Sequence, residues 1–229
     1  MKFGVVTFPG SNCDQDMIYV LNDLLGQHVE QLWHKDTDLK KVDMVIIPGG
    51  FSYGDYLRSG AIAKFSPIMS EVIQHANRGG YVMGICNGFQ ILTESGLLEG
   101  ALLHNNTQKF ICKNVFLKPA STSAALSMDL NQNQAYKIPI AHGEGRFFAS
   151  DDTLKSIQDN DQVLFHYCDE KASITDEANP NGSVYSIAGI TNKNKNVFGM
   201  MPHPERAADQ HLGNKDGLAL FESILNHCS

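Results

Sequence analysis

The stretch Tyr81-Val82-Met83-Gly84-Ile85-Cys86-Asn87-Gly88-Phe89-Gln90-Ile91-Leu92 decides the fold. Its apolar first part predicts a β-strand and its last part predicts a helix, with a sharp turn at Cys86 between them. Gly84 and Gly88 flank this turn as in the nucleophile elbow G-x-S-x-G, with cysteine in place of serine. The start of a helix favours the thiolate form of a cysteine placed there. The stretch therefore predicts an α/β protein with a reactive thiol at the end of a strand.

Apolar runs and helical stretches alternate on the N-terminal side of this elbow. Such alternation is typical of βαβ units and predicts a parallel sheet. The strands before Tyr81 to Ile85 are expected at Phe3 to Phe8, Val29 to Trp33 and Met44 to Ile47, and the helices at Asp14 to Leu25 and about Ile62 to Ala76.

Beyond Gly100 the pattern is more antiparallel in character, because several apolar runs are joined by short turn sequences. Strands are expected at Phe110 to Leu117, Val163 to Tyr167, Val184 to Ile190 and Val197 to Met200, and a closing helix at Asp216 to Leu225. The polar segment from Ala120 to Gln134 is expected to lie on the surface, and its role stays open. We predict one domain over residues 1–229, with a central, mostly parallel sheet and an antiparallel extension.

The composition excludes several classes of function. The chain has 229 residues, 42% of them hydrophobic, and a net charge of −7 without a basic run, which argues against nucleic-acid binding. Its five cysteines include no C-x-x-C pair, which favours a reducing compartment. The stretch Met1 to Phe8 reads as a first strand rather than a targeting segment, and no apolar run is long enough to span a bilayer. We therefore expect a cytoplasmic protein with no membrane contact.

Cys86 has a rival and a simpler interpretation. Cysteine is among the most buried residue types, so Cys86 alone could merely fill the end of a strand. Cys13 also follows a strand and opens a helix, but it lacks the second glycine, and the neighbouring Asp14 opposes thiolate formation. We interpret Cys13 as structural or partner-facing. The other cysteines, Cys112, Cys168 and Cys228, have no chemical context.

A base for the thiol is offered by Pro202-His203-Pro204-Glu205-Arg206. Proline on each side of His203 predicts an extended path, on which His203 and Glu205 project to the same side. Glu205 would then hold the imidazole in the tautomer that accepts a proton from the thiol. Taken alone the motif is equally compatible with a plain strand exit, and its weight comes from occurring together with the elbow.

Donors for an oxyanion are offered by Pro48-Gly49-Gly50-Phe51, which directly follows an apolar strand. Glycines there can direct backbone N–H groups into a cleft at the carboxyl end of a parallel sheet. Together with the N–H of Asn87 they would stabilise a tetrahedral intermediate. An ordinary glycine-rich turn is the alternative interpretation.

With these three pieces in this order, the chain resembles the class I glutamine amidotransferases, and among them the small, free-standing glutaminase subunits of phosphoribosylformylglycinamidine synthase. The resemblance extends from Phe3 to the C-terminal helix and implies a flavodoxin-like, three-layer fold. The motifs that carry it are Gly49-Gly50-Phe51-Ser52-Tyr53-Gly54-Asp55-Tyr56-Leu57-Arg58, Gly84-Ile85-Cys86-Asn87-Gly88-Phe89-Gln90, Ala141-His142-Gly143-Glu144-Gly145-Arg146 and Met201-Pro202-His203-Pro204-Glu205-Arg206.

The resemblance implies a role for each matching residue. It makes Cys86 the nucleophile, His203 the acid and base, and Glu205 the residue that orients His203. The backbone of Gly50 and Phe51, with that of Asn87, would supply the oxyanion donors. The residues assigned to glutamine binding are Gln90, Gly49 and His142, and for His142 a place on the partner surface is the alternative.

The implied reaction releases ammonia from glutamine through a γ-glutamyl thioester on Cys86. A large synthetase subunit, together with a small accessory subunit, would use this ammonia to aminate formylglycinamide ribonucleotide with ATP and Mg²⁺. The chain itself has no P-loop pattern, so we expect no cofactor and no metal in it. Three alternatives stay open: an amidotransferase subunit of another pathway, a stand-alone cysteine hydrolase, and a non-catalytic interaction subunit.

Overall fold

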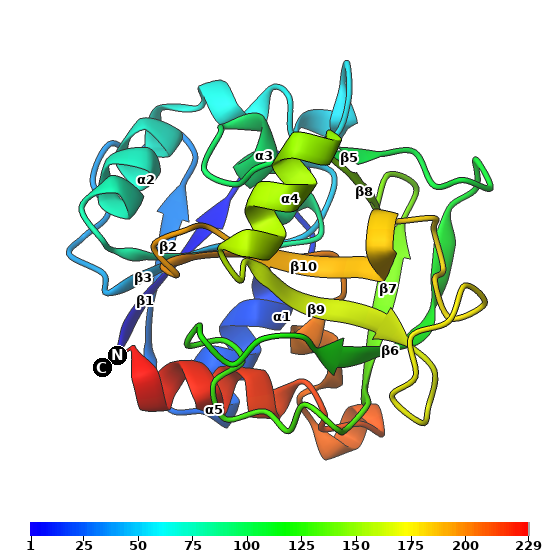
Figure 1. Ribbon diagram of the computed structural model, residues 1–229. Coiled ribbons are helices and arrows are strands. Elements are labelled where there is room, and N and C mark those ends of the chain that lie inside the picture. Colours follow the sequence, from blue (N-terminus) through cyan, green and yellow to red (C-terminus); the bar gives the residue numbers. More distant parts are fainter. Residues whose placement is uncertain (229) are drawn as a thin grey trace.

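The main sheet of the protein has nine strands in the order β2-β1-β3-β4-β11-β10-β9-β6-β7. The computed structural model describes residues 1–228 (Figure 1). The first five strands of this order are parallel, and their order corresponds to the flavodoxin-like 2-1-3-4-5 arrangement. Their bounds are β1 Lys2–Thr7, β2 His28–Trp33, β3 Met44–Ile47, β4 Tyr81–Ile85 and β11 Val197–Met200.

The other half of the sheet is antiparallel throughout. A separate antiparallel pair, β5 with β8, lies outside the main sheet. The mostly parallel sheet with an antiparallel extension is thus confirmed. The bounds of these strands are β5 Ala101–Leu103, β6 Ile111–Pro119, β7 Tyr136–His142, β8 Arg146–Phe148, β9 Val163–Cys168 and β10 Ile187–Thr191.

Helices cover both faces of the sheet, so the protein has the three layers of the predicted fold: helices, sheet and helices (Figure 1). In this view α2, α3 and α4 lie above the sheet, and α1 and α5 lie below it. No helix of the described residues is both long and apolar enough to cross a membrane. The bounds are α1 Asp14–Ile18, continued by a π-helix Tyr19–Leu24, α2 Pro67–Asn77, α3 Asn87–Glu94, α4 Asp151–Asp159 and α5 Leu218–His227.

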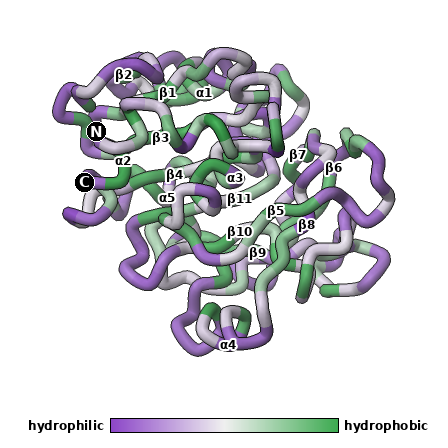
Figure 2. The backbone as a smooth tube through the Cα atoms, turned by 90° about the horizontal axis from the view of Figure 1, so that it is seen from above, coloured by the Kyte–Doolittle hydropathy of each residue, from purple (hydrophilic) through white to green (hydrophobic). Residues whose placement is uncertain are grey.

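Apart from the edge strand β2, in which only Leu32 is buried, the parallel strands form where the sequence is apolar without alternation. All four residues of β3 are buried, and so are all four of β11, because helices cover both of their sides. Figure 2 shows the central strands mostly in the hydrophobic colour and the surrounding loops mostly in the hydrophilic one. This continuous burial fixes the position of the strand ends, from which the site is built.

Four loops converge at the carboxyl end of the parallel half. One leaves each of β1, β3, β4 and β11, which are neighbours in the sheet. The first residues of interest after these strands are Cys13, Gly49, Cys86 and His203 respectively. Because parallel strands place their carboxyl ends at one edge, these loops form a common crevice, where ligands bind in open α/β sheets.

The segment Ala120 to Gln134 agrees with its prediction only in part. It was expected on the surface, and residues 131–134 are exposed, but Ala124, Leu126 and Ser127 are buried. The Oγ atom of Ser223 in α5 donates a hydrogen bond to the carbonyl of Ala125 at 2.6 Å. The small and apolar residues within this polar segment therefore pack against the C-terminal helix, which the polar average of the segment concealed.

Several element boundaries also differ from the prediction. The helix expected from Ile62 begins at Pro67, because proline fits the first turn of a helix and not its interior. The strand expected from Val184 begins at Ile187, after a 3₁₀ turn in which Tyr185 has φ 51°. The sequence interpretation missed β5, β7, β8 and α4. The signal for α4 is a serine N-cap, since Ser150 Oγ accepts from the Thr153 N–H.

The elbow requires glycine at position 88, which gives a testable stability prediction. A Cβ atom added there would lie 1.9 Å from the carbonyl oxygen of Ile47 in β3. Gly88→Ala is expected to lower the free energy of unfolding by about 3 kcal/mol or more, because overpacking against backbone outweighs the helix preference of alanine, which is about 1 kcal/mol. Urea denaturation measures the difference.

The matched control for this substitution is Gly143→Ala, where an added Cβ meets only one atom, at 3.9 Å. Its free energy of unfolding is expected to stay within about 0.5 kcal/mol of the unmodified protein. Equal denaturation midpoints for the two variants would contradict the packing described for the elbow.

Candidate active site

Cys86 sits on a strained turn between β4 and α3. Its backbone has φ 52° and ψ −106°, a region that residues with a side chain rarely adopt. The Cys86 N–H donates to the carbonyl of Met200 at 2.8 Å, which ties the elbow to the end of β11. A Cβ at Gly84 would lie 2.6 Å from the carbonyl oxygen of Gly88. The two glycines therefore allow the close turn that the sequence predicted.

His203 and Glu205 form a buried pair next to this turn. Nδ1 of His203 lies 2.6 Å from Oε1 of Glu205, and the residues are 1% and 2% exposed. The backbone N–H of His203 donates to the carbonyl of Pro139 in β7, which positions the histidine beyond β11. The predicted extended path ends at His203, since a 3₁₀ turn, Pro204–Ala207, follows it. The 3₁₀ turn therefore brings the side chains of His203 and Glu205 together, and not the alternation of an extended strand that the sequence predicted.

The charge of His203 is set by its neighbours. Burial alone lowers the pKa of this imidazole, but the negative charge of Glu205, followed by Cys86 and Cys13, outweighs burial and raises the pKa well above its usual value. The other imidazole nitrogen, Nε2, is buried and has no hydrogen-bond partner within the described residues. The pair therefore presents a nitrogen that can exchange a proton with a substrate.

The turn expected to donate to an oxyanion is only partly oriented for it. The Phe51 N–H donates to the carbonyl of Gly10 at 3.0 Å, so this donor is occupied. Gly50 has φ 139°, a conformation that favours glycine. The N–H of Asn87 belongs to the first turn of α3, where helices leave N–H groups without an intrahelical acceptor. Of the three predicted oxyanion donors, the Phe51 N–H is thus already used in a hydrogen bond within the protein.

A cavity of about 120 Å³ opens between these loops. It is smaller than the pockets of roughly 300–1,000 Å³ that hold drug-sized ligands, which suits a small substrate group. Of the predicted residues it contains Cys86, His203, Gly50 and Phe51. Its complete lining is Asn12, Cys13, Gly50, Phe51, Cys86, Phe110, Ala141, His203 and Arg206.

Cys13 and Arg206 are site residues that the sequence interpretation missed. Cys13 was interpreted as structural or partner-facing, but it lines the same cavity as Cys86 and is 2% exposed. Nη2 of Arg206 donates to its Sγ at 3.2 Å, and Nε of Arg206 donates to Asp16 at 3.0 Å. The sequence feature that could have indicated Cys13 is its position: it follows β1, which is the neighbour of β3 in the sheet, so its loop lies beside the loop that carries Gly49 and Gly50.

Gln90 lies outside the cavity lining and braces the elbow helix. Its side-chain oxygen accepts from Asn87 Nδ2 at 2.9 Å, and its Nε2 donates to the carbonyl of Glu144. Asn87 in turn accepts from the Ser52 N–H at 3.1 Å and donates to Asp55 at 3.2 Å. Burial raises the pKa of Asp55 to about 6. These bonds connect the elbow to the loop that carries the oxyanion turn.

His142 and Gly49 also lie beside the cavity rather than in its lining. Nδ1 of His142 pairs with Asn105 at 3.1 Å, and burial, together with the charge of His203, lowers the pKa of His142 to about 4. His142 is therefore neutral at pH 7. Gly49 leaves room for its neighbours, because an added Cβ would lie 2.7 Å from the His203 ring.

One group of side chains has the spacing of metal ligands. Donor atoms of Cys13, His203 and Glu205 all lie within 4.8 Å of one another among the described residues, and all three residues are buried. Thiolate and imidazole are ligands that Zn²⁺ prefers. The same side chains can serve acid–base chemistry or bind such an ion, but not both at once.

Comparison with known proteins gives concordant matches. The family model of the CobB/CobQ-like glutamine amidotransferase domain matches residues 1–218. The phosphoribosylformylglycinamidine synthase subunit PurQ of Trichormus variabilis is 57% identical over 225 residues, 98% of this chain and 97% of that protein. PurQ of Salinibacter ruber is 52% identical over 228 residues, 100% of this chain and 97% of that protein.

Solved structures agree with these sequence matches. The structure of PurLQS from Thermotoga maritima has a TM-score of 0.88 at 42% identity, covering 100% of this chain and 99% of that chain. A glutamine amidotransferase from the same organism has a TM-score of 0.59 at 13% identity, covering 99% of this chain and 97% of that chain. The second likeness concerns the fold alone.

Proposed function

We propose a function for this chain on the basis of its family. The chain belongs to the CobB/CobQ-like glutamine amidotransferase family, and within it to the PurQ subunits of phosphoribosylformylglycinamidine synthase. The chain is the glutaminase subunit of that enzyme and associates with its synthetase subunit. It hydrolyses glutamine and passes the ammonia on for the conversion of formylglycinamide ribonucleotide to formylglycinamidine ribonucleotide in purine biosynthesis.

The observation that carries the catalytic assignment is the buried pair of His203 and Glu205, 2.6 Å apart, beside Cys86 on its strained turn. In the proposed reaction the Cys86 thiolate attacks the side-chain amide carbon of glutamine. The carbonyl oxygen becomes an oxyanion, which backbone N–H groups of Gly50, Phe51 and Asn87 stabilise. Nε2 of His203 then gives its proton to the nitrogen, and the carbon–nitrogen bond breaks to release ammonia.

The γ-glutamyl thioester left on Cys86 is removed by water. His203, now neutral, takes a proton from the water as it attacks the thioester carbon, and the sulfur leaves as a thiolate. Glu205 holds the imidazole so that Nε2 faces the reaction in both steps. The products are glutamate and ammonia, and both Cys86 and His203 return to their starting protonation.

The remaining parts of the proposal concern the surroundings of this site. The synthetase subunit uses ATP and Mg²⁺, with a small accessory subunit in the complex, while this chain needs no cofactor. Residues 1–229 act as one domain, of which Ser229 lies outside the described residues. Gln90, Gly49 and His142 assist glutamine binding from behind the cavity lining. A cytoplasmic location is proposed because all five cysteines are free thiols, which a reducing compartment maintains.

The small cavity argues against a stand-alone peptidase. A peptide needs an extended groove, whereas about 120 Å³ accommodates a side-chain amide. A second alternative, an amidotransferase of a different pathway, retains the same catalytic residues and differs in its partner, and a third, a non-catalytic interaction subunit, releases no glutamate. Coupled turnover with the synthetase subunit and formylglycinamide ribonucleotide distinguishes the proposed function from both.

We predict that the isolated chain is a weak glutaminase and that the synthetase subunit activates it about a hundred-fold. Such activation requires roughly 2.7 kcal/mol of coupling, a plausible amount for a protein interface. The reason is the Phe51 N–H, which donates to Gly10 and must turn before it can serve an oxyanion. Residues 51–65, at the top of Figure 1, continue from this turn.

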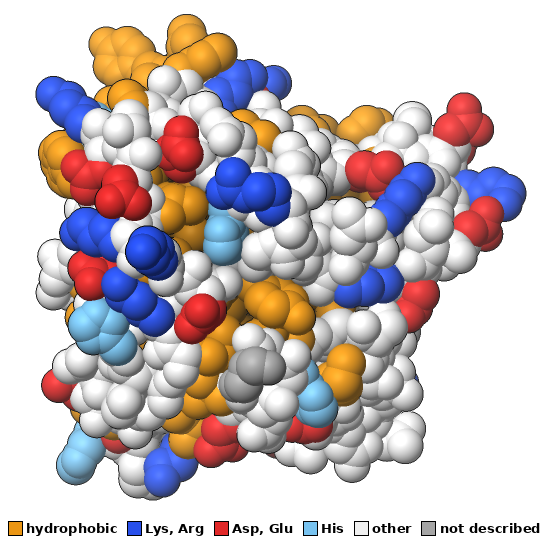
Figure 3. All heavy atoms as spheres, turned by 90° about the vertical axis from the view of Figure 1, so that its left-hand side faces the viewer, with side chains coloured by type: hydrophobic (Ala, Val, Ile, Leu, Met, Phe, Trp, Pro, Cys, Tyr) orange, Lys and Arg blue, Asp and Glu red, His pale blue; other side chains and the backbone are white. Residues whose placement is uncertain are grey.

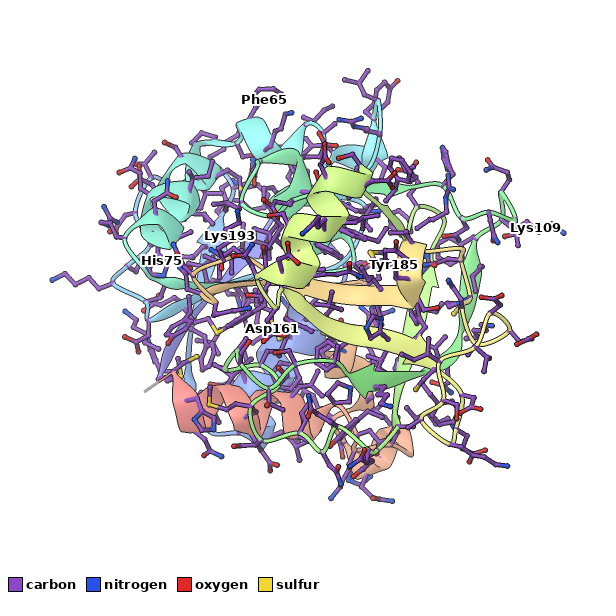
Figure 4. All side chains as sticks on the ribbon, viewed as in Figure 1. Phe65, His75, Lys109, Asp161, Tyr185 and Lys193 are labelled. Carbon is purple, nitrogen blue, oxygen red and sulfur yellow. The ribbon has the colours of Figure 1, made fainter. Side chains whose placement is uncertain are left out.

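Residues 51–65 also carry large hydrophobic side chains that are exposed in the isolated chain. Tyr56, Leu57 and Phe65 are 74%, 89% and 79% exposed. Figure 3 shows hydrophobic side chains gathered at the top of that view, and Figure 4 shows Phe65 pointing outward there. A partner that binds these side chains contacts the segment that continues from the oxyanion turn, and can therefore change the conformation of that turn.

The test of this prediction measures glutamate release by the purified chain before and after addition of the synthetase subunit with its nucleotide and acceptor. Leu57→Ser should weaken the activation without changing the basal rate, because Leu57 is exposed and is not part of the cavity lining. Phe148→Ser, 51% exposed on β8, is the control. Equal rates with and without the partner would show that the site is already organised in the free chain.

A further inference from the structure

Asn87 follows the nucleophile in the chain, and its buried side chain makes three hydrogen bonds. The residue is 2% exposed, and its Oδ1 accepts from the backbone N–H of Ser52 at 3.1 Å. Its Nδ2 donates to Oδ1 of Asp55 at 3.2 Å and to Oε1 of Gln90 at 2.9 Å. The proposed reaction uses only the backbone N–H of Asn87. The three side-chain hydrogen bonds therefore have no task in it so far.

The partners of Asn87 fix which end of its amide faces the oxyanion turn. Gln90 is itself oriented, because its Nε2 donates to the carbonyl of Glu144, so its Oε1 faces Asn87 as an acceptor. Burial raises the pKa of Asp55 to about 6, so this carboxyl is mainly ionised at pH 7 and can only accept. If the amide of Asn87 turned over, its oxygen would lie against these two acceptors. Oδ1 of Asn87 therefore has to face the Ser52 N–H.

Asp55 reaches Asn87 from a strained stretch of backbone. The φ angle is 55° at Tyr53, 52° at Asp55 and 70° at Leu57, a region in which residues with a side chain are uncommon. Such strain persists only where surrounding contacts hold it, and it clusters at functional sites. Here the Tyr53 N–H donates to the carbonyl of Pro9 at 2.6 Å, and Asp55 accepts from Asn87. The stretch is thus held by the loops after β1 and β4, both of which contribute to the cavity lining.

We propose that Asp55 and the side chain of Asn87 are positioning residues for the oxyanion donors, a role that rests on the proposed glutaminase reaction. Asp55 orients the Asn87 amide, and this amide anchors the Ser52 N–H. With Ser52 anchored, rearrangement of the turn is confined to the peptide group between Gly50 and Phe51, which carries the Phe51 N–H. The backbone N–H of Asn87 is another donor. One residue therefore sets the position of the turn relative to the donor on the elbow helix.

The expected signature of this role is a loss of kcat with little change in KM. Oxyanion donors stabilise a charge that exists only in the transition state, so misplaced donors slow the reaction without weakening the binding of glutamine. Asp55→Gly removes the acceptor, and glycine adopts the positive φ without strain. In the complete synthase complex this variant is expected to lower kcat roughly 10- to 100-fold, with KM for glutamine within about two-fold of the unmodified value. Asp55→Asn keeps an oxygen acceptor for Asn87 and should recover most of the loss.

The matched control is Asp161→Gly, because Asp161 has a similar φ of 53° and lies outside the cavity lining. Its kcat and KM should equal those of the unmodified protein. Circular dichroism and ammonia-dependent turnover of the synthetase subunit check that each variant folds and assembles. Unchanged kcat in Asp55→Gly, an equal loss in Asp161→Gly, or Asp55→Asn as slow as Asp55→Gly would overturn the positioning role. A complex of the unmodified chain that releases no glutamate would instead refute the proposed function.

Discussion

Cys86→Ala is expected to lower glutamine hydrolysis by the complete synthase complex on the order of a million-fold. The substitution removes the sulfur that forms the thioester, and the oxyanion donors and the His203–Glu205 pair cannot replace a covalent route. Alanine keeps a Cβ on the strained φ of 52°, so the elbow is unchanged in shape. The measurement is glutamate release, with ammonia-dependent turnover of the synthetase subunit as the check that the complex still assembles.

Two cysteine substitutions serve as comparisons. Cys112→Ala should behave as the unmodified protein, because Cys112 is exposed and outside the cavity. Cys13→Ala should retain far more activity than Cys86→Ala, since Cys13 precedes a short helix without an elbow. Equal losses for Cys13→Ala and Cys86→Ala would remove the basis for assigning the nucleophile to the elbow.

Glu205→Gln is expected to lower kcat by roughly two to four orders of magnitude. Glutamine at this position can donate its N–H to Nδ1 of His203 and so stabilise the wrong tautomer, with the proton on Nε2. The negative charge that raises the pKa of His203 is lost at the same time. His203→Ala should cost more, because it removes the proton carrier itself.

A pH profile separates this role from a structural one. Because Glu205 contributes to the raised pKa of His203, Glu205→Gln should shift the pH dependence of glutaminase activity toward lower values. Glu205→Asp keeps the charge and should recover part of the activity. Wild-type kcat in Glu205→Gln would mean that another group orients His203.

The inner strands of the parallel half were predictable because they are continuously apolar and are closely followed by glycine or proline. Met44–Ile47, Tyr81–Ile85 and Val197–Met200 were predicted with the bounds that the structure has. The elbow was predictable because a cysteine flanked by two glycines, between an apolar strand and a helix, is the pattern that a sharp strand-to-helix turn requires. The order of the motifs along the chain then placed the base and the oxyanion turn at the same sheet edge.

The features that were missed depend on contacts between distant segments. Cys13 and Arg206 are far apart in the sequence, and their contact follows only from the arrangement of the loops after β1 and β11. The donor Phe51 N–H is bound to Gly10, which local sequence cannot reveal. Ala120 to Gln134 is polar on average, yet it buries Leu126 against the rest of the protein.

The most direct test of the account is to identify which residue a glutamine-mimicking electrophile labels. The protein in its complex is treated with such a reagent and analysed by intact-mass and peptide mass spectrometry. The account predicts one adduct per chain, on Cys86, blocked by excess glutamine and absent in Cys86→Ala. An adduct on Cys13, or none under conditions that support turnover, would contradict it.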